Sequence, residues 1–189
     1  SAVQNLINNR KHNRFANDLA YAKLNILHLR ELTKALDVEI SMLNEIMSEG
    51  YIPSGGYLYL GGGTSTFWKD AKNYVNDVVE GINWLERDIE NVEKYLENIN
   101  QHDSDDDTKA YLKCLVEVAE QDINIAKEAI KKAEFLLPEA RKVIKKAKNL
   151  DAQRKAKKHT LSDDDSDNES DDDSDDDSDD DSDDDSDDE

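Results

Sequence analysis

Cysteine is almost missing from this sequence, and histidine is sparse. The single cysteine, Cys114, cannot form an internal disulfide, so nothing points to a small secreted domain held together by disulfides. The four histidines are far apart, and none stands at a metal-ligand spacing from Cys114 or from another histidine. We therefore expect no metal ion and no cofactor. Because Cys114 precedes Leu115 and Val116, it is expected to be a small buried side chain.

Long apolar runs and nucleotide-binding motifs are also missing. No run approaches the roughly 20 apolar residues that span a bilayer, so no membrane association is expected. The polar first residues predict no signal peptide, which favours a cytoplasmic protein. The phosphate-loop motif G-x-x-x-x-G-K-[ST] does not occur, and turn chemistry explains the glycines from Gly55 to Gly63. Because no group of residues resembles an active site, we do not expect an enzyme.

Acidic residues outnumber basic residues, and almost all of the excess lies at one end of the chain. Residues 162–189 hold 18 Asp and 2 Glu, which give this segment a charge of −20, against −21 for the whole chain. The rest of the chain is therefore close to neutral. The segment repeats Ser-Asp-Asp-Asp and has no apolar residue, so it cannot bury a core and is expected to be a disordered acidic tail.

Three stretches carry apolar residues at alternating spacings of three and four, the heptad pattern of coiled-coil helices. They predict helices over about Phe15 to Met47, Trp68 to Ile99 and Lys109 to Leu150; each apolar row is termed a seam. The first seam is broken only by Thr33, and the second is apolar throughout. Alanines alternate with larger residues in the third seam, which would let a partner helix approach closely. Pro138 predicts a kink or break in the third helix.

The segment between the first two predicted helices has a different composition. Tyr57 to Leu60 and Thr64 to Trp68 are rich in aromatic and β-branched residues, and Gly61 to Gly63 lie between them. This pattern predicts a β-hairpin with a glycine turn. An isolated hairpin is marginally stable in water, so this one is expected to pair with other strands or to pack on the helix ends. The side chains expected to mediate assembly are Tyr57, Leu58, Tyr59, Leu60, Phe67 and Trp68.

Helix, hairpin and helix with matching heptads resemble a prefoldin subunit over residues 15–99. The specific resemblance is Tyr57-Leu-Tyr-Leu-Gly-Gly-Gly-Thr-Ser-Thr-Phe-Trp-Lys-Asp-Ala-Lys-Asn-Tyr-Val75, which reads as strand, glycine turn, strand and helix start. The resemblance implies a long antiparallel coiled coil, an oligomeric β-barrel platform built by the hairpin, and holding of unfolded clients by the helix tips without ATP. The client contacts would be Phe15, Leu19, Leu96 and Ile99. Prefoldins normally end after the second helix, so a plain three-helix bundle or coiled coil with a decorated loop stays open.

The acidic tail favours a second kind of function. Each serine in it has an acidic residue three positions later, which resembles the substrate pattern of an acidophilic casein kinase. The predicted phosphorylation sites are Ser162, Ser166, Ser170, Ser174, Ser178, Ser182 and Ser186. Weak binding of divalent cations and a purely solubilising role are the alternatives.

Basic residues gather just before the tail, from Arg141 to Lys158, and resemble a weak two-part nuclear localisation signal. A nuclear location is therefore a second expectation beside the cytoplasm. Nucleic-acid binding is not expected, because the adjacent tail competes for the same cations.

Together these observations predict a mostly α protein with long antiparallel coiled-coil helices, a small β-hairpin, a third helix and a disordered acidic tail. The preferred function is that of a prefoldin-like, ATP-independent co-chaperone or complex-assembly subunit. The alternatives are an acidic-tailed nuclear chaperone for histones or other basic proteins, and a coiled-coil scaffold. Expected partners are coiled-coil subunits and unfolded or basic clients, in a homo- or hetero-oligomer.

The predicted parts are a flexible N-terminus (1–14), the helix–hairpin–helix coiled coil (15–100), an acidic linker (101–107), the third helix (108–150), a basic segment (151–161) and the tail (162–189).

Overall fold

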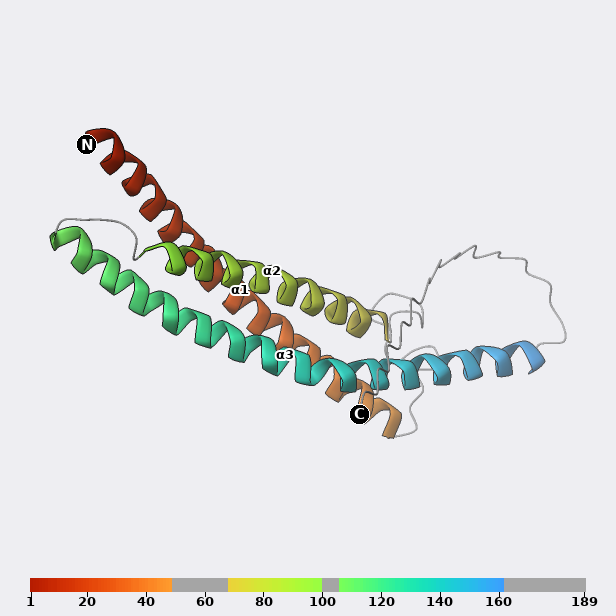
Figure 1. Cartoon of the computed structure of the whole chain (residues 1–189). Helices are drawn as coiled ribbons and strands as arrows, with labels where there is room; N and C mark the ends of the chain where they lie inside the picture. The colour runs from red at the N-terminus through yellow and green to blue at the C-terminus, as the bar shows by residue number, and fades with distance from the viewer. Residues whose placement is uncertain (49–67, 100–105, 162–189) are drawn as a thin grey trace, which may run out of the picture.

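The computed structural model describes residues 1–48, 68–99 and 106–161. These residues form three long helices: α1 (Ala2–Ser48), α2 (Lys69–Ile99) and α3 (Asp106–Leu161). Figure 1 shows α2 running back alongside α1, and α3 running in the same direction as α1. The prediction of a mostly α protein is therefore confirmed. No strand occurs in the described ranges. The hairpin was predicted from Tyr57 to Trp68; residues 57–67 lie outside those ranges, and Trp68, its last residue, is in the turn that opens α2 rather than in a strand.

Two helices extend beyond their predicted ends. α1 begins at Ala2 and so includes residues 1–14, for which a flexible N-terminus was predicted. α3 ends at Leu161 and so includes the basic segment 151–161. The seams marked only the stretches with apolar residues to bury. A helix continues past its seam until a breaker ends it, and no Gly or Pro occurs before Gly50 or between Pro138 and the tail.

Pro138 lies inside α3 without breaking it. Proline has no N–H to donate to the carbonyl of Glu134, and its ring crowds that turn, at a penalty of about 3 kcal/mol. Leu137 and Ala140 beside it are buried in the core, which holds the helix together through this position. Figure 1 shows α3 curving in its teal middle part. Of the predicted kink or break, the break does not occur, and α3 continues through Pro138 with a bend.

The predicted seams are the core of the bundle. Leu29, Leu36 and Leu85 are completely buried, whereas the seam residues Met47, Ile89 and Leu96 are partly buried. The six buried alanines on α3 occupy the helix face that packs inward. Buried seam residues are Leu19, Ala22, Ile26, Leu29, Leu36, Ile40 and Leu43 on α1, Ala71, Val75, Val78, Ile82, Leu85, Val92 and Ile99 on α2, and Leu112, Ala119, Ile123, Ala126, Ile130, Ala133, Leu137, Ala140, Ile144 and Ala147 on α3.

Thr33, the only polar residue in the first seam, forms a hydrogen bond within α1. Its hydroxyl donates to the backbone carbonyl of Leu29 at 2.7 Å. Such a bond to the preceding turn removes the penalty for burying an unpaired hydroxyl. A single threonine therefore does not interrupt the packing of the seam.

Polar contacts between the helices agree with this arrangement. Asn25 of α1 donates to Asp88 of α2 at 2.5 Å. Lys23 of α1 lies 3.8 Å from the carboxylate of Asp122 on α3, and Lys127 of α3 lies 3.2 Å from Glu93 on α2. Each helix thus contacts both of the others, and α3 is an integral part of the bundle.

One core prediction was wrong. Cys114 was expected to be buried, but it is exposed on α3. The inward face of this part of α3 is formed by Leu112 and Ala119, which are two helical turns apart and buried. Cys114 lies off that face, because residues two positions apart on a helix point in very different directions.

Candidate protein-binding surfaces

Trp68 is the only predicted assembly residue among those the structure describes. Its indole N–H donates to the carboxylate of Asp151 on α3 at 3.3 Å, and the ammonium of Lys148 lies 4.6 Å from its ring centroid. Its carbonyl accepts from the backbone N–H of Lys72 at 3.1 Å, which closes the first turn of α2. Trp68 therefore anchors the start of α2 on α3. The other five lie outside the described residues: Tyr57, Leu58, Tyr59, Leu60 and Phe67.

The four predicted client contacts are packed inside the bundle. Phe15, Leu19 and Ile99 are buried, and Leu96 is partly buried. Phe15 and Leu19 of α1 pack in one buried cluster with Ala119 and Ile123 of α3. The expectation that these residues stand free at the helix tips is therefore corrected. It treated α1 and α2 as an open-ended pair, whereas the first half of α3 covers that end.

α1 carries a second apolar row that its own seam does not use. Leu24, Leu27, Val38 and Met42 are 61%, 57%, 57% and 45% exposed, respectively. Leu24 and Met42 are 18 residues apart, which is five full turns of an α-helix, so they lie on the same face. The row is interrupted between Leu27 and Val38 by the exposed carboxylate of Glu31. Single exposed apolar residues are common on proteins, but a row along one helix face is less so. The row, together with Tyr21 (63% exposed), is termed the outer face of α1.

This row was readable in the sequence but was not predicted. The heptad pattern predicted one buried face on α1, and no function was predicted for its other apolar residues. A helix that is apolar on two faces is a signal in its own right, because one face can be buried by the chain itself and the other requires a different partner.

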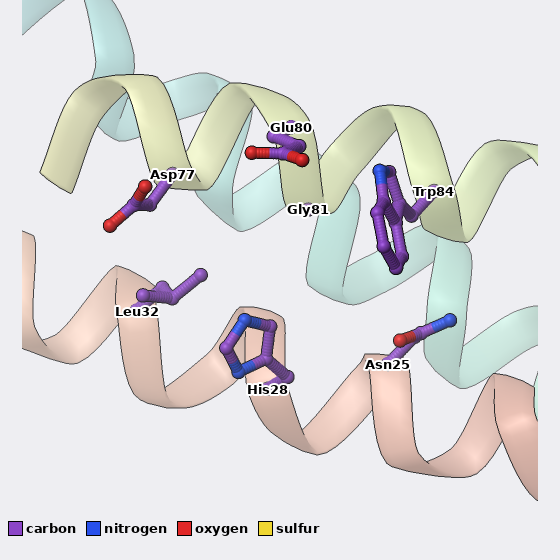
Figure 2. A pocket seen from close by; sticks show the side chains of 7 residues that line it. All are labelled: Asn25, His28, Leu32, Asp77, Glu80, Gly81 and Trp84. Carbon is purple, nitrogen blue, oxygen red and sulfur yellow. The ribbon is translucent and has the colours of Figure 1, made fainter. Parts of the chain in front are cut away.

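A groove lies between α1 and α2 on the surface of the bundle (Figure 2). Its volume is about 270 Å³. A side chain at Gly81 would protrude here, since a Cβ built on it would lie 3.4 Å from Leu29 Cδ1 and 3.8 Å from Leu32 Cδ1. Glycine therefore leaves the middle of the groove open. The lining side chains are Asn25, His28 and Leu32 from α1, with Asp77, Glu80 and Trp84 from α2.

The groove combines an aromatic wall with two carboxylates. Trp84 is 54% exposed, so much of its indole ring is available to a partner. In Figure 2 Trp84 hangs from α2 toward Asn25, while His28 reaches up from α1 toward Gly81. Neither Asp77 nor Glu80 has an ion-pair or hydrogen-bond partner within the part of the chain that the structure describes.

A second groove, between α1 and α3, is larger at about 430 Å³ but differs in its charges. There Glu31 lies 4.0 Å from Lys34, and Glu128 lies 3.9 Å from Lys132. Its carboxylates already face cationic neighbours. The α1–α2 groove is thus the one with carboxylates still available to a ligand.

Like charges flank the α1–α2 groove on both sides. Burial raises the pKa of Asp88, and the negative charge of Asp18 across the helix pair raises it further, although the hydrogen bond from Asn25 opposes this. Burial likewise raises the pKa of Glu39, with a further rise from Asp70. Two pairs of acidic side chains, Asp18 with Asp88 and Glu39 with Asp70, therefore lie along this helix pair.

Other kinds of site find little support in residues 1–48, 68–99 and 106–161. No group of three or more His, Cys, Asp or Glu side chains in these ranges could hold a metal ion. None of the helices there has an apolar stretch long enough to cross a bilayer. The seven predicted phosphorylation sites lie beyond Leu161, outside the described residues.

Comparisons with known protein families, curated proteins and solved structures found no match.

Proposed function

We propose that the chain is a prefoldin-like, ATP-independent co-chaperone or complex-assembly subunit that acts by binding other proteins. The observation that carries this proposal is the outer face of α1. Its apolar side chains are left in water although the bundle core is complete without them. A partner protein with apolar segments of its own is what such a face would bind.

The strength of such a contact can be bounded. Burying a Leu, Val or Met side chain completely stabilises by about 1.5–3 kcal/mol, and these side chains are already about half buried. Four of them together would contribute a few kcal/mol, which is comparable to the lower end of the association penalty of about 4–15 kcal/mol. A single chain would therefore hold a client weakly and reversibly. Several chains in one assembly would hold it more tightly through multivalency.

The hairpin is proposed to provide that assembly. Changing Tyr57 and Tyr59 to Asp should lower the oligomeric mass measured by light scattering, while the helix content seen by circular dichroism stays the same. Changing the exposed Tyr111 of α3 to Asp is the matched control and should leave the mass unchanged. An unaltered mass in the hairpin variant would remove the assembly role. Recovery of other prefoldin-type subunits with the chain from native cells, identified by mass spectrometry, would support membership of such a complex.

Client holding is tested by following the aggregation of a chemically unfolded protein after dilution. The wild-type chain should suppress aggregation without ATP. A variant with Leu24→Ser and Val38→Ser should suppress it less, because both substitutions lie on the outer face of α1. A variant with Tyr111→Ser and Val118→Ser removes two exposed apolar side chains from α3 and should behave like wild type. Equal activity of the two variants would mean that the outer face of α1 is not the client site.

The second candidate function is a chaperone for histones or other basic proteins, favoured by the charge of −20 in residues 162–189. Phosphorylation of the tail serines would add about −1.5 to −2 charges each and strengthen that attraction. Deletion of residues 162–189 separates the candidates. Holding of unfolded clients by α1 should survive the deletion, whereas binding of a histone through the tail should be lost.

A further inference from the structure

We propose that the α1–α2 groove at Gly81 binds a lysine or arginine side chain from a basic segment of a partner protein. The inference rests on the proposed function, because it names the chemistry of one class of protein partner. It adds a site on the folded bundle, separate from the outer face of α1 and from the acidic tail. Figure 2 shows the side chains that form it, with α3 behind the helix pair.

The size of the groove suits one long side chain. Its volume of about 270 Å³ lies below the roughly 300–1,000 Å³ that is typical of pockets for small molecules and cofactors. The missing side chain at Gly81 keeps the passage between the two helices open. An extended side chain laid across α1 and α2 is therefore a better fit than a compact organic ligand.

The lining matches the two parts of a lysine or arginine side chain. Leu32 offers an apolar surface for the hydrocarbon stem. The exposed ring of Trp84 attracts a cation through its negative π-face, and tryptophan is the best of the aromatic side chains for this interaction. Asp77 and Glu80 are three residues apart on α2, so they lie on one side of the helix and can approach the same cationic head.

The neighbouring charges favour a basic segment over an isolated amine. On α2 the acidic residues Asp70 and Asp88, each near an acid of α1, stand on either side of the groove. They are 18 residues apart, which is about 27 Å along the helix. A partner segment with several lysines or arginines would relieve the like-charge repulsion at both ends while one side chain fills the groove.

NMR of the full-length chain tests the proposal. The probe is a capped peptide of alternating glycine and lysine, and its control is the same peptide with glutamine in place of lysine. The indole N–H resonance of Trp84 is assigned with a Trp84→Phe variant, which distinguishes it from Trp68. The lysine peptide should move this resonance in a saturable way, and the glutamine peptide should not.

Variants with equal charge changes separate the groove from general electrostatics. Asp77→Asn with Glu80→Gln should weaken the Trp84 response at least tenfold. Glu86→Gln with Glu90→Gln removes the same charge from exposed positions of α2 outside the groove and should change it less than twofold. Trp84→Leu keeps an apolar side chain without the indole ring. For this variant the response of the Gly81 amide should weaken several-fold.

Two results would overturn the inference. In the first, the peptide shifts only resonances of residues 162–189 and leaves Trp84 unmoved, so that the tail alone binds it. Alternatively, the two double variants would lose affinity equally, which would make the attraction nonspecific. Either result leaves the aggregation test untouched, so client holding by the outer face of α1 stands or falls separately.

Discussion

The ring of Tyr95 on α2 lies flat against the ring of Phe15 on α1, with the centroids 3.9 Å apart and the planes 11° from parallel. The Tyr95 hydroxyl also meets Nδ1 of His12, a buried residue one turn before Phe15. Burial raises the pKa of Tyr95 to about 12, and the nearby Tyr111 adds to the rise. These contacts join α1 and α2 at the end of the bundle where α3 begins.

Tyr95 should make the bundle sensitive to alkaline pH. Its folded pKa of about 12 lies above the ordinary value of 10.0, so its contribution to stability is complete below pH 10 and is lost as the pH rises toward 12. Tyr95→Phe should lower the free energy of unfolding by about 1 kcal/mol at neutral pH through the lost hydrogen bond. The variant should then lose less stability than wild type above pH 10. Urea melts at a series of pH values measure this, with Tyr21→Phe as an exposed control; parallel pH profiles for Tyr95→Phe and wild type would contradict it.

The seam of α2 should set the stability of the bundle. Leu85 is completely buried, so Leu85→Ala should lower the free energy of unfolding by about 2–5 kcal/mol. Leu24→Ala removes the same atoms from a side chain that is 61% exposed and should change it by less than about 0.5 kcal/mol. Denaturant melts of both variants give the comparison. A small effect at Leu85 would mean that the seam is not packed in solution.

Gly81 should be replaceable by alanine with a gain in stability. Alanine is about 1 kcal/mol more favourable than glycine in a helix interior. The added methyl group would lie 3.4 Å from Leu29 Cδ1, at the close limit of ordinary van der Waals contact. We expect Gly81→Ala to raise the free energy of unfolding by about 0.5–1 kcal/mol. A loss of stability for Gly81→Ala would show that α1 and α2 lie closer together at this position.

The buried alanines of α3 should not tolerate enlargement. Ala133 has no exposed surface, so Ala133→Leu should force the helices apart and lower the free energy of unfolding by about 1–3 kcal/mol. Glu134→Leu at the adjacent exposed position is the control, with an expected change within about 0.5 kcal/mol. Thermal melts monitored by circular dichroism suffice. If both substitutions had the same effect, Ala133 would not be a close-packed position.

Heptad spacing predicted which residues of α1, α2 and α3 are buried, because seam burial depends on the helical repeat alone. Heptad spacing could not predict how many other helices pack against each seam. Leu19 and Ile99 end their seams, and an end is free or covered according to where another helix packs. The first turns of α3 decide this, and their position depends on contacts between residues far apart in the sequence, such as Phe15 with Ala119.

The groove was beyond the reach of the sequence for a similar reason. A glycine inside a helix indicates only a weaker helix, and Asp77, Glu80 and Trp84 lie outside the seam, so none of these positions by itself indicates a groove. Which residues of α1 they face, such as His28 and Leu32, depends on how α2 is aligned along α1. The seams do not distinguish alignments that differ by seven residues. The outer face of α1, by contrast, needs only the helical repeat of one helix and could have been predicted.

Pro138 gives α3 a built-in place for partial opening. The carbonyl of Glu134 has no amide partner there, so the hydrogen-bond ladder that makes a helix cooperative is interrupted in the middle of the longest helix. Beyond that gap, α3 is held by side-chain packing around Val143 and Ala147 and by the contact of Asp151 with Trp68. Amide hydrogens after Pro138 can therefore exchange with solvent through local opening of this segment. Exchange at the centre of α2, by contrast, requires the whole bundle to unfold. α3 is thus one helix in shape, and we expect its two segments to open separately; only the second carries the basic residues next to the tail.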